Sequence, residues 1–193
     1  MTELLEPTDG GYLLRLHTAE IDLLEALGSG LESTLDAAQP EHPVIARLFP
    51  AAVDGDDEAD RELRRLMRDD LLEQRRAGLR NLTDLLARAR PAGDDDRRAD
   101  DLTADDGNHT RVVTLTDDEA HLVLGVINDL RIAVAAQLPA AVLARDERPE
   151  DRAVAYRLDV LDHLAWMQHH LLAALDPDAV RAESDTDTDE DET

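Results

Sequence analysis

Residues 111–138, RVVTLTDDEAHLVLGVINDLRIAVAAQL, contain the strongest structural signal in the chain. The first five residues are rich in β-branched side chains and predict a short strand. Thr116 and Glu119 then have the spacing of a capping box, in which two side chains satisfy the first free N–H groups of a helix. The apolar residues that follow recur at helical intervals. The segment therefore predicts a strand that leads directly into an apolar helix ending near Leu138.

A similar join lies near the N-terminus. Residues 16–20, LHTAE, resemble residues 115–119, LTDDE, because both place Leu at the end of a strand and Glu four residues later. The preceding GYLLRL (11–16) predicts the strand, and a helix is expected from Thr18 to about Leu35. We expect the two strands to pair as a small two-stranded ribbon with a helix leaving each strand. The alternative is that both apolar runs are loop segments.

Three more helices are expected along the rest of the chain. A short one begins near Pro43, because proline suits the first helical turn. The longest covers residues 58–89 and ends before Pro91 and Gly93. The last begins near residues 149–151 and ends near Leu175. Only 2% of the residues are aromatic, so the core must consist of Leu, Val, Ile and Ala. The fold class predicted is mainly α, a helical bundle of about four main helices with the small ribbon added.

The polar segments define the expected domain organisation. Residues 92–110 (AGDDDRRADDLTADDGNHT) are too polar to build core and predict an acidic flexible linker. Residues 176–193 carry no apolar periodicity and predict a disordered acidic tail. Residues 1–175 are therefore expected to form a single helical domain around one core.

The composition limits the classes of function. The formal net charge is −25, lysine is absent and there are no cysteines. Such a charge opposes non-specific binding to DNA and to anionic membranes. Without cysteine the chain has no disulfide, thiolate metal site or thiol switch of its own. No apolar run reaches the length of about 18 residues that a membrane-spanning helix needs. The N-terminal residues lack the pattern of a secretory signal, so we expect a cytoplasmic protein.

Motifs of enzymes are missing from the sequence. There is no G-x-S-x-G, no phosphate-binding glycine loop and no H-E-x-x-H. The chain is therefore predicted not to be an enzyme, and no cofactor is expected.

The long helix carries the one basic island of the chain. Arg64, Arg65 and Arg68 are the candidate contacts in it, either to DNA phosphates or to an acidic protein. However, residues 58–90 have a net charge of only +2, and binding driven by counterion release needs a larger clustered excess. The sequence favours a solvated face with pairs four residues apart, such as Asp60–Arg64 and Arg65–Asp69. Any DNA contact is expected to be weak.

The last helix contains HLAWMQHHLL (163–172), with the only tryptophan of the chain. On a helical wheel, an apolar arc includes Leu164, Leu171 and Leu172, and the opposite side carries Trp166 with Asp159, His163 and His170. Asp and His four residues apart can hold part of a zinc site, but such a site needs three or four ligands. Tryptophan is enriched in interface hot spots, so a partner surface is the second interpretation. The third is that a neighbouring part of the protein covers Trp166.

One buried ion pair is also predicted. Arg131 falls within the apolar arc of the helix from Thr116, and Asp70 falls within the apolar stripe of the long helix. A buried unpaired charge costs several kcal/mol. We therefore expect Asp70 and Arg131 to pair directly, or through Gln74.

Four stretches together resemble one protein family. They are the N-terminal strand and helix, ARLFPAAVDGDDEADRELRRLMRDDLLEQRRAGL (46–79), LTDDEAHLVLGVINDLRIAVAAQL (115–138) and LAWMQHHLLAAL (164–175). The family is an actinobacterial domain of unknown function (number two thousand and seventeen), now described as actinomycete oxidative-stress transcriptional regulators. The resemblance covers most of residues 11–175. The chain departs from the family in having no cysteine for a thiol switch and in carrying an acidic tail.

The resemblance implies a non-enzymatic regulator that acts in the stress response through RNA polymerase or a sigma factor. Its genes often lie near those of the Clp protease adaptor, which implies an adaptor linked to Clp proteolysis as an alternative. The second alternative comes from the histidines, and is a helical domain that binds a metal or a small molecule.

Overall fold

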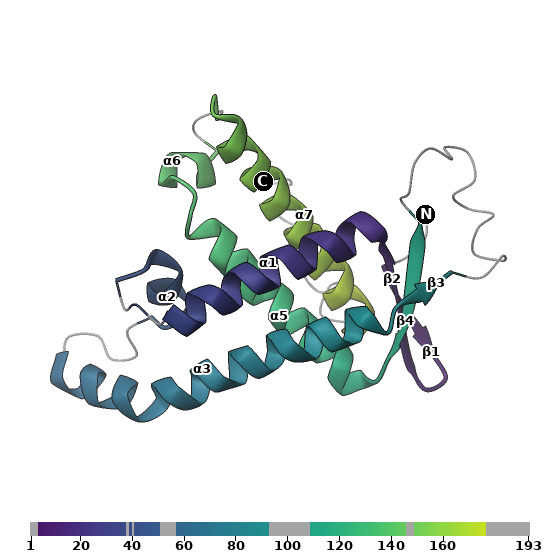
Figure 1. Ribbon diagram of the computed structural model, residues 1–193, viewed down its shortest axis with the longest axis horizontal. Helices are drawn as coiled ribbons and strands as arrows, with labels where there is room; N and C mark the ends of the chain where they lie inside the picture. The colour runs from purple at the N-terminus through teal and green to yellow at the C-terminus, as the bar shows by residue number, and fades with distance from the viewer. Residues whose placement is uncertain are drawn as a thin grey trace, which may run out of the picture.

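The computed structural model describes residues 4–37, 39, 41–50, 57–92, 109–145 and 149–176, with the backbone alone for residues 57–68. Within these residues six helices and four strands follow one another (Figure 1). Their order is β1 (Leu5–Thr8), β2 (Gly11–His17), α1 (Thr18–Ala37), α2 (Pro43–Leu48), α3 (Asp57–Ala87), β3 (Arg90–Pro91), β4 (Thr110–Leu115), α5 (Asp117–Ala135), α6 (Ala140–Leu143) and α7 (Arg152–Leu175).

The predicted helices are confirmed, with small changes at their ends. The long ones are α1, α3, α5 and α7, as expected for a chain of about four main helices. Pro43 is in the first turn of α2, and Val44 N–H donates to Nδ1 of the capping His42 at 3.3 Å. Helix α5 ends at Ala135, three residues before the expected end, because the chain must leave the helical conformation before Pro139.

The strands form one four-stranded antiparallel sheet, with the order β1-β2-β4-β3, rather than a two-stranded ribbon. The central pair is the predicted one, and Leu14 of β2 lies opposite Val113 of β4. The edge strands are short, and each contains a proline, Pro7 or Pro91. Proline cannot donate to a further strand, so both edges are protected against pairing with another chain. Neither edge strand is long enough to show an alternating pattern in the sequence.

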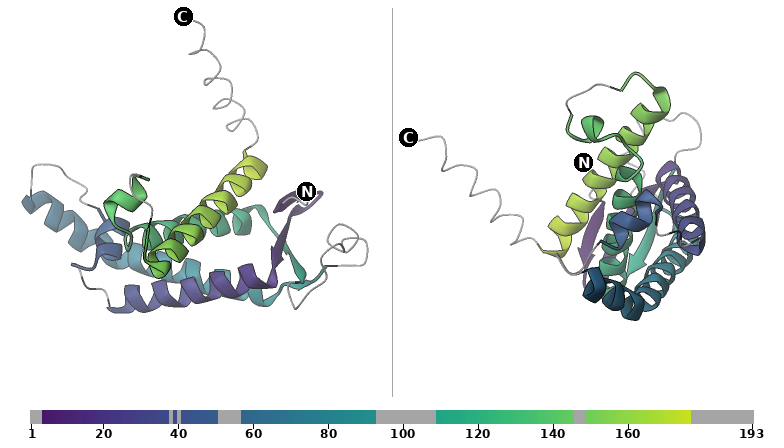
Figure 2. Two further views of the ribbon diagram at one scale, coloured as in Figure 1. Left: turned by 90° about the horizontal axis from the view of Figure 1, so that it is seen from above. Right: turned by 90° about the vertical axis from the view of Figure 1, so that its left-hand side faces the viewer.

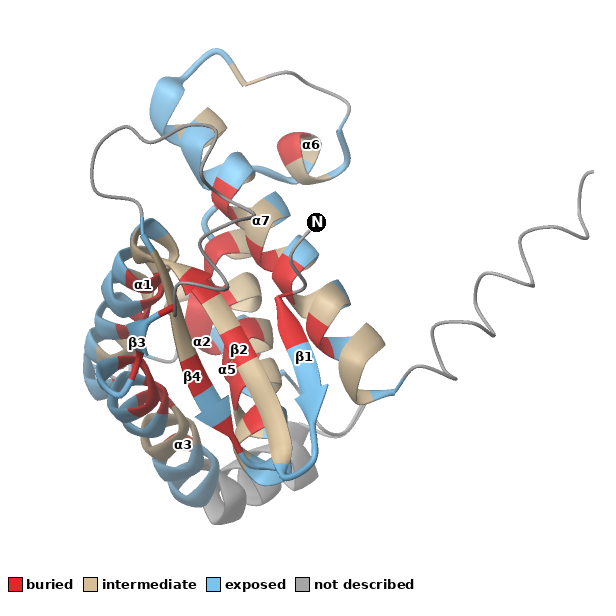
Figure 3. Cartoon of the chain, turned by 90° about the vertical axis from the view of Figure 1, so that its right-hand side faces the viewer, coloured by how far each residue is buried: buried red, intermediate tan, exposed pale blue. Residues whose placement is uncertain are grey.

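The sheet lies at one end of the molecule, and α1 and α3 run side by side away from it (Figures 1 and 2). Its inner face packs on the helices through residues that include Leu5, Leu14 and Leu16 (Figure 3). The buried side chains are almost all Leu, Val, Ile and Ala, and Met167 is the one buried methionine among the described residues. The predicted aliphatic core is therefore confirmed.

Both strand-to-helix joins have the same local geometry. At the start of α5, Thr116 N–H donates to the Glu119 carboxylate at 2.9 Å, and Glu119 N–H donates to Thr116 Oγ1 at 3.2 Å. At the start of α1, His17 N–H donates to the Glu20 carboxylate at 2.8 Å. The similarity of LHTAE and LTDDE therefore has a physical basis, because each glutamate satisfies a backbone donor just before a helix.

The two halves of the fold repeat the same order of elements. Two strands, a long helix, a short helix and a second long helix occur first as β1 to α3 and again as β3 to α7. The five buried residues of α1 each correspond to a buried residue of α5 found 99 positions later: Ile21, Leu24, Gly28, Leu31 and Leu35 against Ala120, Val123, Ile127, Leu130 and Val134. The central pair Leu14–Val113 has the same separation, so the strand register fits a two-fold relation between the halves.

The predicted linker and tail lie largely outside the described residues. The ends of the linker are described and belong to the sheet, because Ala92 N–H donates to the carbonyl of Thr110 at 3.0 Å. Residues 93–108 and 177–193 are outside the described part of the chain.

Candidate protein-interaction surface on α7

Helix α7 is rotated relative to the predicted wheel. Asp151 caps it by accepting from Ala153 N–H at 2.6 Å. Its buried residues are Val160, Leu164, Met167 and Leu171, whereas Leu172, which was expected in the core, is 40% exposed. The prediction for Leu172 is therefore wrong. The core face has shifted toward the histidines, because Val160 and Met167 fill positions that the wheel left on the outer side.

Trp166 remains outside the core, as predicted, with 43% of its surface exposed. It lies between two histidines of the same helix. The ring of His163 is stacked with it at a centroid distance of 5.6 Å, and the ring of His170 lies 4.3 Å away at a tilted angle. These contacts limit the rotamers of the indole, so a large and partly apolar side chain is held in place at the surface.

His163 connects this region to α1. Its Nε2 lies 3.1 Å from Oε1 of Glu20, whose side chain is only 15% exposed. Burial by itself would raise the pKa of Glu20, but contact with His163 and the N–H of His17 outweighs it, so the pKa lies below its usual value. Glu20 thus links the first turn of α1 to the middle of α7. The wheel placed His163 on the exposed side, and the structure shows it at the edge of the packed face.

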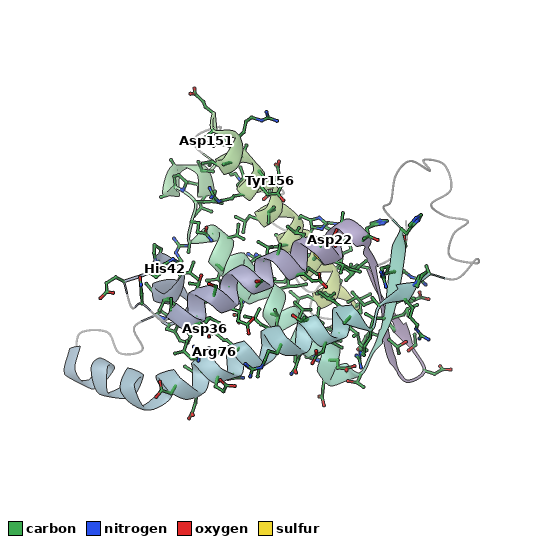
Figure 4. All side chains as sticks on the ribbon, viewed as in Figure 1. Asp22, Asp36, His42, Arg76, Asp151 and Tyr156 are labelled. Carbon is green, nitrogen blue, oxygen red and sulfur yellow. The ribbon has the colours of Figure 1, made fainter. Side chains whose placement is uncertain are left out.

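A stripe of exposed and partly buried residues follows one side of α7. It consists of Tyr156, Asp159, His163, Trp166, His170 and Ala173, and is called the α7 stripe below. Tyr156, labelled in Figure 4, is 62% exposed. The chain has only four aromatic residues, one Trp, two Tyr and one Phe, and two of them are on this stripe.

The packed face of α7 has an equivalent on α3, and Asn81, the residue equivalent to Trp166, is exposed as Trp166 is. Leu79, Leu82 and Leu86 of α3 are buried and correspond to Leu164, Met167 and Leu171, found 85 positions later. In this correspondence Trp166 matches Asn81, and His163 matches Gly78. A Cβ atom at Gly78 would lie 3.3 Å from a methyl group of Val126, so α3 packs closely on α5 at this level. Helix α7 reaches α1 through the Glu20–His163 pair, so α1 contacts one residue in the middle of the stripe.

The arginines of α3 that the structure describes are used within the protein. Arg75 forms an ion pair with Asp129 of α5, and its guanidinium lies 5.3 Å from the ring centre of Phe49. Arg76 contacts Asp36 of α1 at 3.0 Å (both are labelled in Figure 4), and Arg88, which directly follows α3, contacts Glu119 at 2.8 Å. These pairs agree with the interpretation of α3 as a structural helix. The side chains of the candidate residues Arg64, Arg65 and Arg68 lie outside the described part.

The predicted Asp70–Arg131 pair is wrong. Asp70, like Gln74 and Asn81, is exposed, so the polar line on α3 faces solvent. Arg131 instead donates to Oε1 of Gln168 on α7, and Gln168 donates in turn to Asn128 at 3.4 Å. A neutral amide thus accepts from Nη1 of the half-buried guanidinium, and the buried Nε of Arg131 has no hydrogen-bond partner among the described residues. The ion pair that joins α3 to α5 is Arg75–Asp129, in which the signs are reversed relative to the prediction.

No group of three or more potential metal ligands occurs among the described residues. Asp159 is exposed and is not brought to the histidines as a ligand cluster. In the same part of the chain, no helix is long and apolar enough to cross a membrane.

Comparison with known proteins identifies a family. Residues 1–175 match the family described as Domain of unknown function (DUF2017). The chain belongs to this family. The match ends where α7 ends, so it covers every element described above. No curated protein and no solved structure matches the chain.

Proposed function

We propose that this DUF2017 protein is a non-enzymatic intracellular regulator that binds other proteins through the α7 stripe. The observation that carries the proposal is Trp166, the single tryptophan of the chain, which is 43% exposed on the outer side of α7. Replacing an interface tryptophan by alanine is among the substitutions that lose the most binding free energy, because the indole buries a large area and keeps one polar N–H group.

The partner in this proposal is a sigma factor or RNA polymerase, and the process is transcription regulation in the stress response. The resemblance of the four sequence stretches to actinomycete oxidative-stress regulators supports this choice. The charge distribution supports contact with protein rather than with DNA. The net charge is −25, and Arg75, Arg76 and Arg88 are already paired with carboxylates of the same chain.

Affinity capture from the native cytoplasm tests this function. The wild-type chain, Trp166→Ala and Leu172→Ala are compared. Leu172 is as exposed as Trp166 but points away from the stripe, so its variant is the matched control. We expect polymerase or sigma subunits with the wild type and with Leu172→Ala, and their loss with Trp166→Ala. Protease subunits in their place would favour the adaptor alternative, and equal capture by all three chains would contradict the role of the stripe.

A further inference from the structure

The α7 stripe has the spacing of a coiled-coil seam. Its six residues, Tyr156, Asp159, His163, Trp166, His170 and Ala173, are separated alternately by three and four positions. This heptad-like interval places side chains along a line that a second helix can follow. Most surface helices have polar residues on such a line, whereas this one has two aromatic residues and a small one.

Within the stripe and the positions next to its middle, the carboxylates and the histidines are segregated along the helix, and Arg152 and Arg157 add positive charge before Asp159. Asp159 and Asp162 lie before the middle of the stripe, and His169 and His170 lie after it. His163 and Trp166 occupy the middle. Groups from other elements also face this region, because Glu20 of α1 contacts His163 and Arg145 pairs with Asp162. Asp162 and Arg145 are both half-exposed, so their pair leaves the carboxylate accessible.

This order makes the stripe complementary to itself when two copies run antiparallel. A coiled-coil seam alternates between two positions of the heptad, called a and d. In antiparallel coiled coils, each a residue of one helix faces a d residue of the other. Around a two-fold axis between residues 164 and 165, Asp159 meets His170 of the second copy, and His163 meets Trp166. Tyr156 meets Ala173, a large residue against a small one. Beside the seam, Asp162 meets His169. A parallel copy would instead place carboxylate against carboxylate.

We propose that two copies of this chain associate through their α7 stripes in this antiparallel arrangement. This dimer does not depend on the proposed function, because the residues of α7 alone define its seam. The dimer would cover Trp166, so association of two copies and binding of another protein are alternatives at one surface. A seam of six layers is at the small end of protein interfaces, so the dimer depends on concentration.

A charge-swap experiment on the full chain tests the arrangement, with sedimentation equilibrium as the measurement and about 0.15 M salt to screen the net charge. The wild type is expected to dimerise as concentration rises. Asp159→His places histidine against histidine, and His170→Asp places carboxylate against carboxylate. Each single variant should weaken the dimer at least about tenfold. The double variant should restore it, and an equimolar mixture of the two single variants should form the heterodimer.

Asp84→His is the control, because it makes the same change at an exposed position of α3 and should leave the association unchanged. Circular dichroism melting shows that each variant is folded. A wild-type chain that stays monomeric at every concentration would overturn the proposal, and so would swaps that neither weaken nor restore the dimer. The purified chain alone is used, so failure here is distinguishable from failure to capture polymerase or a sigma factor.

Discussion

Glu20 and Glu119 each perform two tasks with one carboxylate. Each accepts from the backbone N–H that precedes its helix, and each contacts a side chain on a more distant helix, His163 or Arg88. In both cases the contacted helix belongs to the other half of the fold. A residue that ends a strand-to-helix join therefore also holds the halves together.

The cap of α5 allows a quantitative test. Replacing Thr116 by alanine removes the side chain that accepts from Glu119 N–H. Loss of an N-cap of this kind costs about 1 kcal/mol of the free energy of unfolding, measured by chemical denaturation. Thr114→Ala is the control, because Thr114 is exposed in β4 and is not in the cap. A Thr116→Ala variant as stable as the wild type would show that the capping box does not contribute.

The same two glutamates predict a response to acid. For Glu119 the N–H of Thr116 is the main cause that lowers the pKa, and burial opposes it; for Glu20 burial is outweighed by the contacts described above. A carboxyl group with a pKa lowered by folding stabilises the folded state above its unfolded pKa, near 4.5, and this stabilisation is lost as pH falls through the lower folded value.

We therefore expect the free energy of unfolding to fall as the pH decreases below 4.5, and to fall less in Glu20→Gln than in the wild type. Urea titrations at a series of pH values measure this slope. Glu25→Gln, an exposed change on the same helix, should keep the wild-type pH dependence. An identical slope in Glu20→Gln and wild type would show that the Glu20 contacts are absent in solution.

Sequence reasoning at this scale succeeded where the signal is local. The capping box and the position of Trp166 outside the apolar arc follow from spacing along one helix. The Glu20–His163 and Arg75–Asp129 contacts join residues far apart in the chain, so no local pattern indicates them. The one available signal was the resemblance of LHTAE to the capping-box segment, which marks Glu20 as a residue with a defined role.

Among the elements, helices were predictable and the edge strands were not. Each long helix repeats its apolar pattern over several turns, whereas β3 consists of Arg90 and Pro91 alone. The rotation of α7 was missed because Val160, Met167 and Leu172 are all apolar. The wheel gives no reason to choose among them until the positions of α5 and β1 are known.

One contact at the element scale joins α2, α3 and α5. Arg75 of α3 reaches Asp129 of α5, donates to the carbonyl of Leu48 at 3.3 Å and lies over Phe49. The side chains of Arg75 and Asp129 are both largely buried. The loss of either therefore leaves the other as a largely buried charge without its partner.

A double-mutant cycle with Arg75→Met and Asp129→Asn measures this coupling. We expect a coupling free energy of about 1–3 kcal/mol, the range found for residues in direct contact. The cycle Asp70→Asn with Arg131→Met is the matched comparison, and it should give a value near zero because the two residues do not meet. A coupling in the second cycle as large as in the first would contradict the described packing.

At the scale of the whole molecule, the repeat of two strands and three helices explains the symmetric order of the sheet. It is hard to recognise from sequence because the halves share apolar character rather than identical residues, as in Ile21 against Ala120 and Gly28 against Ile127. The halves differ on the outer side of their last helix, where Trp166 of α7 corresponds to the exposed Asn81 of α3.

The net charge predicts how the molecule responds to salt. A chain with a charge of −25 repels itself most when it is folded, and screening extends over about 10 Å at 0.1 M ionic strength. We expect the melting temperature, measured by circular dichroism, to rise as salt increases from very low values. A flat or falling melting temperature over that range would show that attractive pairs such as Arg88–Glu119 outweigh the repulsion.

The central claim is that Trp166 is the main contact of a protein-binding surface. The most direct test is a binding titration of the purified chain with purified sigma factor and with RNA polymerase. In the wild type, the fluorescence of Trp166 reports binding. For the variants, binding is measured with the chain immobilised on a surface. The account predicts binding by the wild type, an affinity at least about 30-fold weaker for Trp166→Ala, as for an interface hot spot, and an unchanged affinity for Leu172→Ala. Equal affinities for Trp166→Ala and the wild type, or no binding by the wild type, would contradict it.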